Sequence, residues 1–218
     1  MRLRVKICCI ASREEAALAV AYGADAVGLV SEMPSGPGVI SDELAREIAA
    51  ATPPAVASFL LTSRQSAPAI VEQQRFVRAN TLQLVDRLTH GTYRDLRDEL
   101  PGIGLVQVIH VCGEESVEEA LHVAADVDAV LLDSGDQRLA VKQLGGTGRT
   151  HDWALSRRVV EQAGRPVFLA GGLRPENVRE AIERVRPFGL DVCSGVRTDG
   201  RLDERKLAAF FNQLEGFR

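Results

Sequence analysis

The chain lacks the features that mark membrane, secreted and nucleic-acid-binding proteins. No apolar run approaches membrane-spanning length, and the N-terminus, MRLRVKICCIASREE, is charged too early to hold the apolar core of a signal peptide. Lys and Arg are scattered along a chain of net charge -4, with no basic stripe. We therefore expect a cytoplasmic protein that binds neither membranes nor nucleic acid.

Cysteine and histidine are few and are not spaced as metal ligands. Adjacent Cys8 and Cys9 do not form a C-x-x-C motif, and no histidine pair accompanies them. We expect reduced thiols and no metal site at the four cysteines, which are Cys8, Cys9, Cys112 and Cys193. The histidines are too dispersed for a catalytic triad, and we assign no chemistry to His90, His110, His122 and His151.

Aromatic residues make up only 5% of the 218 residues, while the hydrophobic share is 45%. Such a chain builds its core from Val, Leu and Ala, which is ordinary for an α/β protein. Apolar runs predict eight strands, at Leu3 to Ile10, Ala26 to Val30, Val56 to Leu61, Thr81 to Val85, Leu105 to Val111, Ala129 to Asp133, Pro166 to Ala170 and Leu190 to Cys193. Helical patterns follow at Arg13 to Tyr22, Ser41 to Ala51, Pro68 to Arg78, Tyr93 to Leu100, Glu115 to Ala125, Trp153 to Ala163, Pro175 to Val185 and Asp203 to Leu214.

Eight strands that each precede a helix, without a linker, predict a single (β/α)₈ barrel over residues 1–218. The alternative is an open doubly wound sheet, which usually places its glycine-rich phosphate turn after the first strand. Here the glycine-rich turns, Gly171 with Gly172 and Ser194 with Gly195, follow the seventh and eighth strands. Barrels frequently bind phosphate at that place, although such glycines also make ordinary tight turns.

The first strand carries a candidate catalytic thiol. Side chains alternate along a strand, so Val5, Ile7 and Cys9 share one face, and Lys6 and Cys8 share the face that we assign to the barrel interior. Cys8 lies at the catalytic end of this strand, and the ammonium of Lys6 would lower its pKa and make it a base. The other interpretation is a small buried residue.

Three more strands carry polar residues where the core should be apolar. Asp133 closes the sixth strand and is either a general acid or base or a cap of the next turn. Asp191 interrupts the eighth strand and requires a partner or a ligand. Gln83 either binds substrate or satisfies neighbouring backbone. The glycine-rich connection Ser134 to Thr150 is either a closing loop or an ordinary flexible one.

Seven motifs in order resemble phosphoribosylanthranilate isomerases of tryptophan biosynthesis: VKICCI, GADAVGLV, LQLV, VLLDS, GGTGRTHDW, FLAGGLRPENV and GLDVCSGV. The resemblance implies a (β/α)₈ barrel that carries out an Amadori rearrangement of a sugar phosphate without cofactor or metal. On this model Asp133 is the general acid and Cys8 the general base. The phosphate-binding positions are Gly171, Gly172, Ser194 and Gly195, and the substrate-binding positions are Lys6, Gln83 and Asp191.

The chain departs from the family pattern away from the phosphate. The family motif K-I-C-G ends in glycine, where this chain has Cys9. The family motif P-S-P-R-Y-V has an arginine at about the position of Gly38. The family motif Q-L-H-G ends in His-Gly, where this chain has Val85 and Asp86. The arginine would hold the anthranilate carboxylate, and we consider Arg64 or Arg87 as its replacement. Three hypotheses remain: the family's isomerase, a paralogue that acts on another sugar phosphate, and a non-catalytic metabolite binder. The sequence leaves open a monomer or a homodimer.

Overall fold

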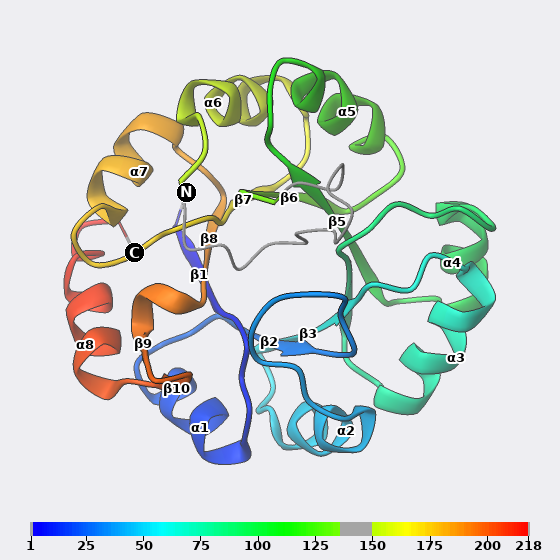
Figure 1. The fold of residues 1–218 in the computed structure, drawn as a ribbon, viewed down its shortest axis with the longest axis horizontal. Helices are drawn as coiled ribbons and strands as arrows, with labels where there is room; N and C mark the ends of the chain where they lie inside the picture. The colour runs from blue at the N-terminus through cyan, green and yellow to red at the C-terminus, as the bar shows by residue number, and fades with distance from the viewer. Residues whose placement is uncertain (1, 136–149, 218) are drawn as a thin grey trace.

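A computed structural model, which describes residues 2–135 and 150–217, shows a closed barrel of eight parallel strands ringed by helices (Figure 1). The strands are β1 (Arg4–Ile7), β2 (Ala26–Val30), β3 (Ala57–Thr62), β4 (Thr81–Leu84), β5 (Gly104–His110), β6 (Ala129–Asp133), β7 (Val167–Leu169) and β8 (Gly189–Val192). The helices are α1 (Arg13–Ala21), α2 (Asp42–Ala51), α3 (Ala67–Val77), α4 (Tyr93–Glu99), α5 (Glu115–Val123), α6 (Trp153–Gln162), α7 (Val178–Val185) and α8 (Glu204–Asn212). The predicted (β/α)₈ barrel is confirmed.

Pairing between the first and last strands closes the barrel. Lys6 lies opposite Asp191, and Ile7 lies opposite Val192, in the parallel register of β1 and β8. Cys8 continues this ladder, because its N–H donates to the carbonyl oxygen of Val192 at 2.8 Å. Closure therefore brings the catalytic end of β1 against the end of β8, although the two lie at opposite ends of the chain.

Polar side chains set where most of the helices begin. Ser12, Ser41 and Asp203 each accept a hydrogen bond from a backbone N–H in the first turn of their helix, at 2.9–3.2 Å. The predicted bounds are confirmed to within a few residues. The largest shift is at α7, which begins at Val178 rather than Pro175, because residues 175–177 form a turn.

Two apolar layers hold the barrel together. The larger layer packs the outward faces of the strands, including Val5 and Ile7, against the helices. The smaller layer fills the barrel interior, where Phe59 and Phe168 meet edge to face with ring centroids 6.0 Å apart. The C-terminal ends of the strands surround the mouth of the barrel at one end of this interior layer. Among the described residues, no helix is long and apolar enough to cross a membrane.

A short structure after β8 was not predicted from the sequence. The turn η1 (Ser194–Val196) leads into a hairpin of β9 (Arg197–Thr198) and β10 (Arg201–Leu202), which lies beside α1 and α8 (Figure 1). Strands of two residues are too short to leave a periodic signal. The hairpin matters because it positions Arg197 under the end of β1, as described below.

Candidate active site

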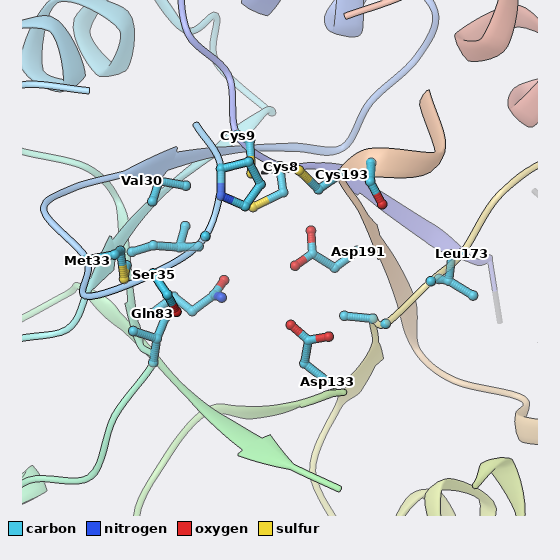
Figure 2. A pocket seen from close by; sticks show the side chains of 18 residues that line it. Cys8, Cys9, Val30, Met33, Ser35, Gln83, Asp133, Leu173, Asp191 and Cys193 are labelled. Carbon is cyan, nitrogen blue, oxygen red and sulfur yellow. Dashed lines mark hydrogen bonds between the residues drawn. The ribbon is translucent and has the colours of Figure 1, made fainter. Parts of the chain in front are cut away.

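A pocket opens at the C-terminal ends of the strands (Figure 2). Cys8 and Asp133 lie on opposite sides of it, and Asp191 lies between them. Most of the residues predicted for the site line this pocket, namely Cys8, Gln83, Asp133, Gly171, Gly172, Asp191 and Ser194. The structure therefore brings together residues of five different strand ends, as the barrel predicts.

Lys6 lies behind the pocket rather than in it. The side chain is fully buried, and its Nζ donates to Asp191 Oδ1 at 2.9 Å and to Cys8 Sγ at 3.4 Å. Burial opposes the charge of Lys6, but Asp191 and Cys8 together raise its pKa, so the ammonium is retained. Asp191 thus has the partner that its place in an apolar strand required, and a substrate contact by Lys6 stays a prediction.

The surroundings of Cys8 favour its thiolate. A hydrogen bond from Cys9 lowers the pKa of Cys8; burial and the charge of Asp191 oppose this, and the charge of Lys6 reinforces it. The net direction is downward from the ordinary value. Burial raises the pKa of Asp191, in spite of Lys6, and the charge of Asp133 adds to the rise.

Gly28 in β2 makes the contact between Lys6 and Cys8 possible. A Cβ built on Gly28 would lie 2.8 Å from Cys8 Sγ and 3.0 Å from Lys6 Nζ. No other residue would leave space for both side chains. The sequence analysis did not single out Gly28, although a glycine inside an apolar strand is a known signal of close approach.

Asp133 and Gln83 present polar groups to the pocket in different ways. Asp133 Oδ1 accepts the N–H of Ser134 at 2.7 Å, so the carboxylate both caps the turn and faces the cavity (Figure 2). Gln83 is 2% exposed, and its Oε1 has no hydrogen-bond partner among the described residues. A buried amide without a protein partner favours a ligand contact over the backbone alternative.

The two glycine-rich turns meet backbone to backbone. Gly171 and Gly172 have φ of 84° and 63°, which favour glycine, and Asn177 Nδ2 fastens the turn by donating to the Gly172 carbonyl oxygen at 2.9 Å. A Cβ on Gly195 would overlap the carbonyl oxygen of Leu173. Gly171, Gly172 and Ser194 line the pocket, whereas Gly195 lies in a neighbouring groove with Arg174 and Arg205.

Cys9 does not lie where strand alternation placed it. The expectation that it faces the helices with Val5 and Ile7 is wrong, because β1 ends at Ile7 and Cys9 has φ of 62°. This left-handed conformation turns its side chain into the interior layer, where it lines the pocket. Its position is the one where the family pattern has glycine, which adopts such a φ without strain.

Cys9 and Gly38 are neighbours in space. Gly38 has φ of 78°, and a Cβ built on it would overlap the Cβ of Cys9. An arginine at position 38 would therefore collide with the Cys9 side chain. The two departures from the family pattern are complementary, since the side chain gained at position 9 fills space beside the one lost at position 38.

Arg197 holds the backbone of Cys8 and Cys9, which follow β1, by hydrogen bonds to their carbonyl oxygens. Its Nη2 donates to the carbonyl oxygens of Cys8 at 3.1 Å and of Cys9 at 2.6 Å, and its guanidinium pairs with Glu15 at 3.1 Å. The side chain is 6% exposed, so this is a buried clamp rather than a surface pair. A sequence search could not find it, because the hairpin that carries Arg197 was itself not predicted.

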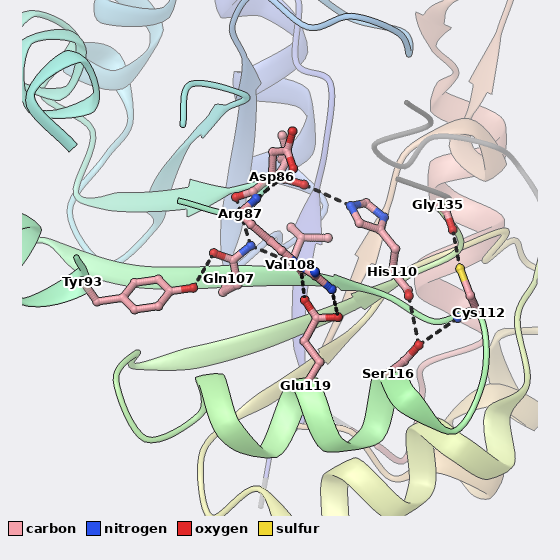
Figure 3. A network of polar contacts seen from close by, with 11 residues as sticks. Asp86, Arg87, Tyr93, Gln107, Val108, His110, Cys112, Ser116, Glu119 and Gly135 are labelled. Carbon is pink, nitrogen blue, oxygen red and sulfur yellow. Dashed lines mark hydrogen bonds and ion pairs between the residues drawn. The ribbon is translucent and has the colours of Figure 1, made fainter. Parts of the chain in front are cut away.

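Neither arginine considered as the replacement cation reaches the pocket. Arg87 forms a bidentate pair with Glu119 of α5 at 2.6–2.7 Å, in a polar network that joins β4, β5 and α5 (Figure 3). Arg64 donates to the Ala69 carbonyl oxygen and lies 3.7 Å from Asp42. That expectation is therefore wrong, and no Lys or Arg lines the pocket among the described residues.

The third departure lies in the network of Figure 3. Gln107 Nε2 donates to the carbonyl oxygens of Leu84 and Asp86, and His110 Nε2 donates to that of Val85 at 3.0 Å. Asp86 accepts the N–H of Arg87 at 2.9 Å. These contacts hold the end of β4 to β5. Val85 lines the pocket, and Asp86 is 5% exposed.

Comparison with known proteins places the chain. The family model of N-(5'-phosphoribosyl)anthranilate isomerase matches residues 5–213. The chain belongs to this family. A curated isomerase of that name from Methanocella arvoryzae is 36% identical over 208 residues, which cover 95% of each chain.

Solved structures agree with this membership. The phosphoribosyl anthranilate isomerase of Thermotoga maritima superposes with a TM-score of 0.80 at 34% identity, covering 98% of this chain and 99% of that one. A structure of a phosphoribosyl anthranilate isomerase in complex with reduced 1-(o-carboxyphenylamino)-1-deoxyribulose 5-phosphate matches with a TM-score of 0.78 at 33% identity, with the same coverage. The predicted family is confirmed, and the connection Ser134 to Thr150 lies largely outside the described residues.

Proposed function

We propose that the protein isomerises N-(5'-phosphoribosyl)anthranilate to 1-(o-carboxyphenylamino)-1-deoxyribulose 5-phosphate, as a step of tryptophan biosynthesis in the cytoplasm. The observation that carries the proposal is one pocket in which Cys8 faces Asp133 beside two glycine-rich turns, in a chain of the isomerase family. The reaction moves protons within one substrate, so the proposal includes no cofactor. A monomer and a homodimer are both compatible with it, because every residue invoked belongs to one chain.

The first step is opening of the sugar ring. Asp133 donates its proton to the ring oxygen, the bond from that oxygen to C1' breaks, and the nitrogen lone pair forms the C1'=N bond of a Schiff base. The carboxyl group lies at the mouth of the pocket, across from Cys8, so acid and base act on different sides of the sugar. Separation of the two groups prevents them from neutralising each other.

The second step is removal of the proton on C2'. Cys8 acts as a thiolate, which Cys9 and Lys6 favour, and takes this proton while the electrons of the C–H bond move to form an enolamine. Return of a proton to C1' and loss of one from the C2' hydroxyl give the ketone. Lys6 supports Cys8 and Asp191 through its two hydrogen bonds behind the pocket.

Binding uses the remaining residues of the pocket. The turns of Gly171, Gly172 and Ser194 leave backbone N–H groups unobstructed for a phosphate. Gln83 offers its buried amide to a sugar hydroxyl. Together they hold the sugar phosphate between Cys8 and Asp133.

The direct test is turnover of N-(5'-phosphoribosyl)anthranilate by the purified protein. Cys8→Ser and Asp133→Asn should each lower kcat by roughly 10²- to 10⁴-fold, the usual contribution of a positioned acid or base, with little change in folding. Cys112→Ser, which changes an exposed thiol outside the pocket, is the matched control and should leave kcat unchanged. Urea unfolding of each variant excludes loss of activity through misfolding. Absence of wild-type turnover, together with failure to rescue a tryptophan auxotroph, contradicts the proposal.

One observation favours a second candidate, a related isomerase whose substrate lacks the carboxylate. No Lys or Arg lines the pocket within residues 2–135 and 150–217, and Gly38 stands where the family pattern has arginine. A carboxylate without a cation forgoes a charge-assisted bond that contributes about 1.5–3 kcal/mol. Comparing kcat/KM for the anthranilate substrate and for its aniline analogue decides between the two, because preference for the anthranilate substrate removes this candidate.

A further inference from the structure

Two thiols beside Cys8 have no direct part in the proposed reaction. The Sγ atoms of Cys9 and Cys193 lie 2.7 Å apart, and both residues line the pocket. Cys9 is 5% exposed, whereas Cys193 is half-buried and is the more exposed residue of the two. A small oxidant that enters the pocket can therefore reach this pair.

The backbone allows the two sulfurs to be joined. Cys193 follows Val192, which pairs with Ile7 across β1 and β8. Neighbouring strands are about 4.8 Å apart, which lies within the range of Cα separations that a disulfide bridges. The left-handed Cys9 directs its side chain toward β8, and Arg197 holds this conformation through the carbonyl oxygens of Cys8 and Cys9.

We propose that Cys9 and Cys193 are a reversible oxidation site, and that their disulfide lowers activity by removing the S–H that Cys9 donates to Cys8. The oxidant class is a peroxide. The Cys193 sulfur loses its proton and attacks one oxygen of hydrogen peroxide, the O–O bond breaks, and Cys193 becomes a sulfenic acid. The released hydroxide takes up the proton from the Cys193 thiol and becomes the first water. The Cys9 sulfur then attacks Cys193 Sγ, the S–O bond breaks, and the second oxygen leaves as water. Two thiols and one peroxide give one disulfide and two waters.

The charges around the pair suit this chemistry. The guanidinium of Arg197 interacts electrostatically with both Cys193 and Cys9. Hydrogen bonds with Cys193 and Cys8, together with burial, raise the pKa of Cys9 well above its ordinary value. Cys9 is therefore a protonated thiol in the reduced protein and a hydrogen-bond donor to Cys8.

Peptide mapping after peroxide treatment tests the site without any assay of turnover. The protein is oxidised, denatured and alkylated, and the remaining free thiols are identified by mass spectrometry. We expect Cys8 to be alkylated, Cys9 and Cys193 to be protected, and dithiothreitol to restore labelling of both. Cys8 and Cys9 are adjacent, so variants are needed to show which of them pairs with Cys193. Cys8→Ser should still form the disulfide, and Cys9→Ser should not.

Two further variants complete the mapping. Cys193→Ser should abolish the disulfide, and Cys112→Ser should leave it intact, since Cys112 lies outside the pocket on the segment between β5 and α5. A wild-type protein that forms no disulfide overturns the proposal. So does a disulfide that persists in Cys9→Ser, because its partner would then be Cys8.

The test of activity after oxidation rests on the proposed function, whereas the peptide mapping of the disulfide does not. Oxidised wild-type protein with Cys8 free should show kcat/KM at neutral pH lowered several-fold, because loss of the Cys9 hydrogen bond raises the pKa of Cys8 and reduces the thiolate fraction. Dithiothreitol should restore it, and higher assay pH should reduce the difference. A complete Cys9–Cys193 disulfide with unchanged kcat/KM overturns the proposal, while a protein inactive in both forms contradicts the proposed function instead.

Discussion

The two ends of the pocket are built from different material. The end that we propose binds phosphate, called the phosphate end below, is made of backbone in the turns after β7 and β8. There Gly171 and Gly172 have positive φ, and Gly195 packs against Leu173. The opposite end is made mainly of side chains, from Cys9, Met33, Ser35 and Pro37. A backbone contact admits few substitutions, because any Cβ would collide. A side-chain contact can change when two residues change together, as Cys9 and Gly38 illustrate.

We expect the largest effect from a substitution at Gly195, in the backbone contact of the phosphate end. In Gly195→Ala the new Cβ would overlap the Leu173 carbonyl oxygen and lie 2.9 Å from Arg174 Cα, and backbone cannot move aside cheaply. We expect the free energy of unfolding to fall by about 1–3 kcal/mol. KM for the phosphorylated substrate should also rise, by roughly tenfold, the equivalent of about 1.4 kcal/mol of lost binding. Urea denaturation and steady-state kinetics measure the two effects.

Gly104→Ala is the matched control, because a Cβ there meets Thr81 no closer than 3.4 Å, an ordinary contact. It should be neutral within about 0.5 kcal/mol. If both alanine variants behave alike, the backbone contact between the turns is not what shapes the phosphate end.

The side-chain end is tested by exchanging its pair of residues. Gly38→Arg alone should destabilise the protein by about 1–3 kcal/mol, because arginine collides with Cys9 and takes up a left-handed φ. Adding Cys9→Gly removes the collision but leaves the φ strain. A double-mutant cycle in thermal or urea unfolding should therefore show a favourable coupling of about 0.5–3 kcal/mol.

Strict additivity of the two substitutions contradicts the idea that they compensate each other. The double variant also tests the function of the arginine. It should bind the anthranilate substrate more tightly than Cys9→Gly alone, with no change for the aniline analogue, since only the former has a carboxylate to pair.

The pH dependence of kcat/KM reports on the thiol end of the pocket. Cys8 must be a thiolate, so the rate falls as pH drops through its pKa, and the net lowering of this pKa moves that acid limb below the ordinary thiol range. Cys9→Ala removes the hydrogen bond that lowers the Cys8 pKa most and should shift the limb to higher pH. Cys112→Ser should leave the limb in place. An unshifted limb in Cys9→Ala contradicts the assigned hydrogen bond.

The smallest effect is expected at Arg87. Arg87→Ala breaks a pair with Glu119 on the outer surface, where the Arg87 side chain is 64% exposed, so stability should change by no more than about 1 kcal/mol. KM for the anthranilate substrate should stay the same, because Arg87 does not line the pocket. A raised KM in kinetic assays would restore Arg87 as the cation that replaces the missing arginine.

The sequence predicted those site residues that can be recognised from the pattern of a single strand. Cys8, Asp133, Asp191 and Gln83 were found because each is polar within or at the end of an apolar strand, and the barrel fold brings those ends together. The face of Cys9 was predicted wrongly, because strand alternation fails once the backbone becomes left-handed. Alternation also could not show that Lys6 would be covered by Asp191 and Cys8.

The order of strands, helices and glycine turns was determined by the sequence itself, because hydrophobic periodicity and turn residues act over a few positions. The family was indicated by the resemblance of seven motifs in that order. Only the tertiary structure decided which residues meet around Cys8. Cys9 and Cys193 are 184 positions apart, and Lys6 and Asp191 are 185 apart. Their contacts exist because β1 pairs with β8 to close the barrel, and closure depends on all eight strands at once.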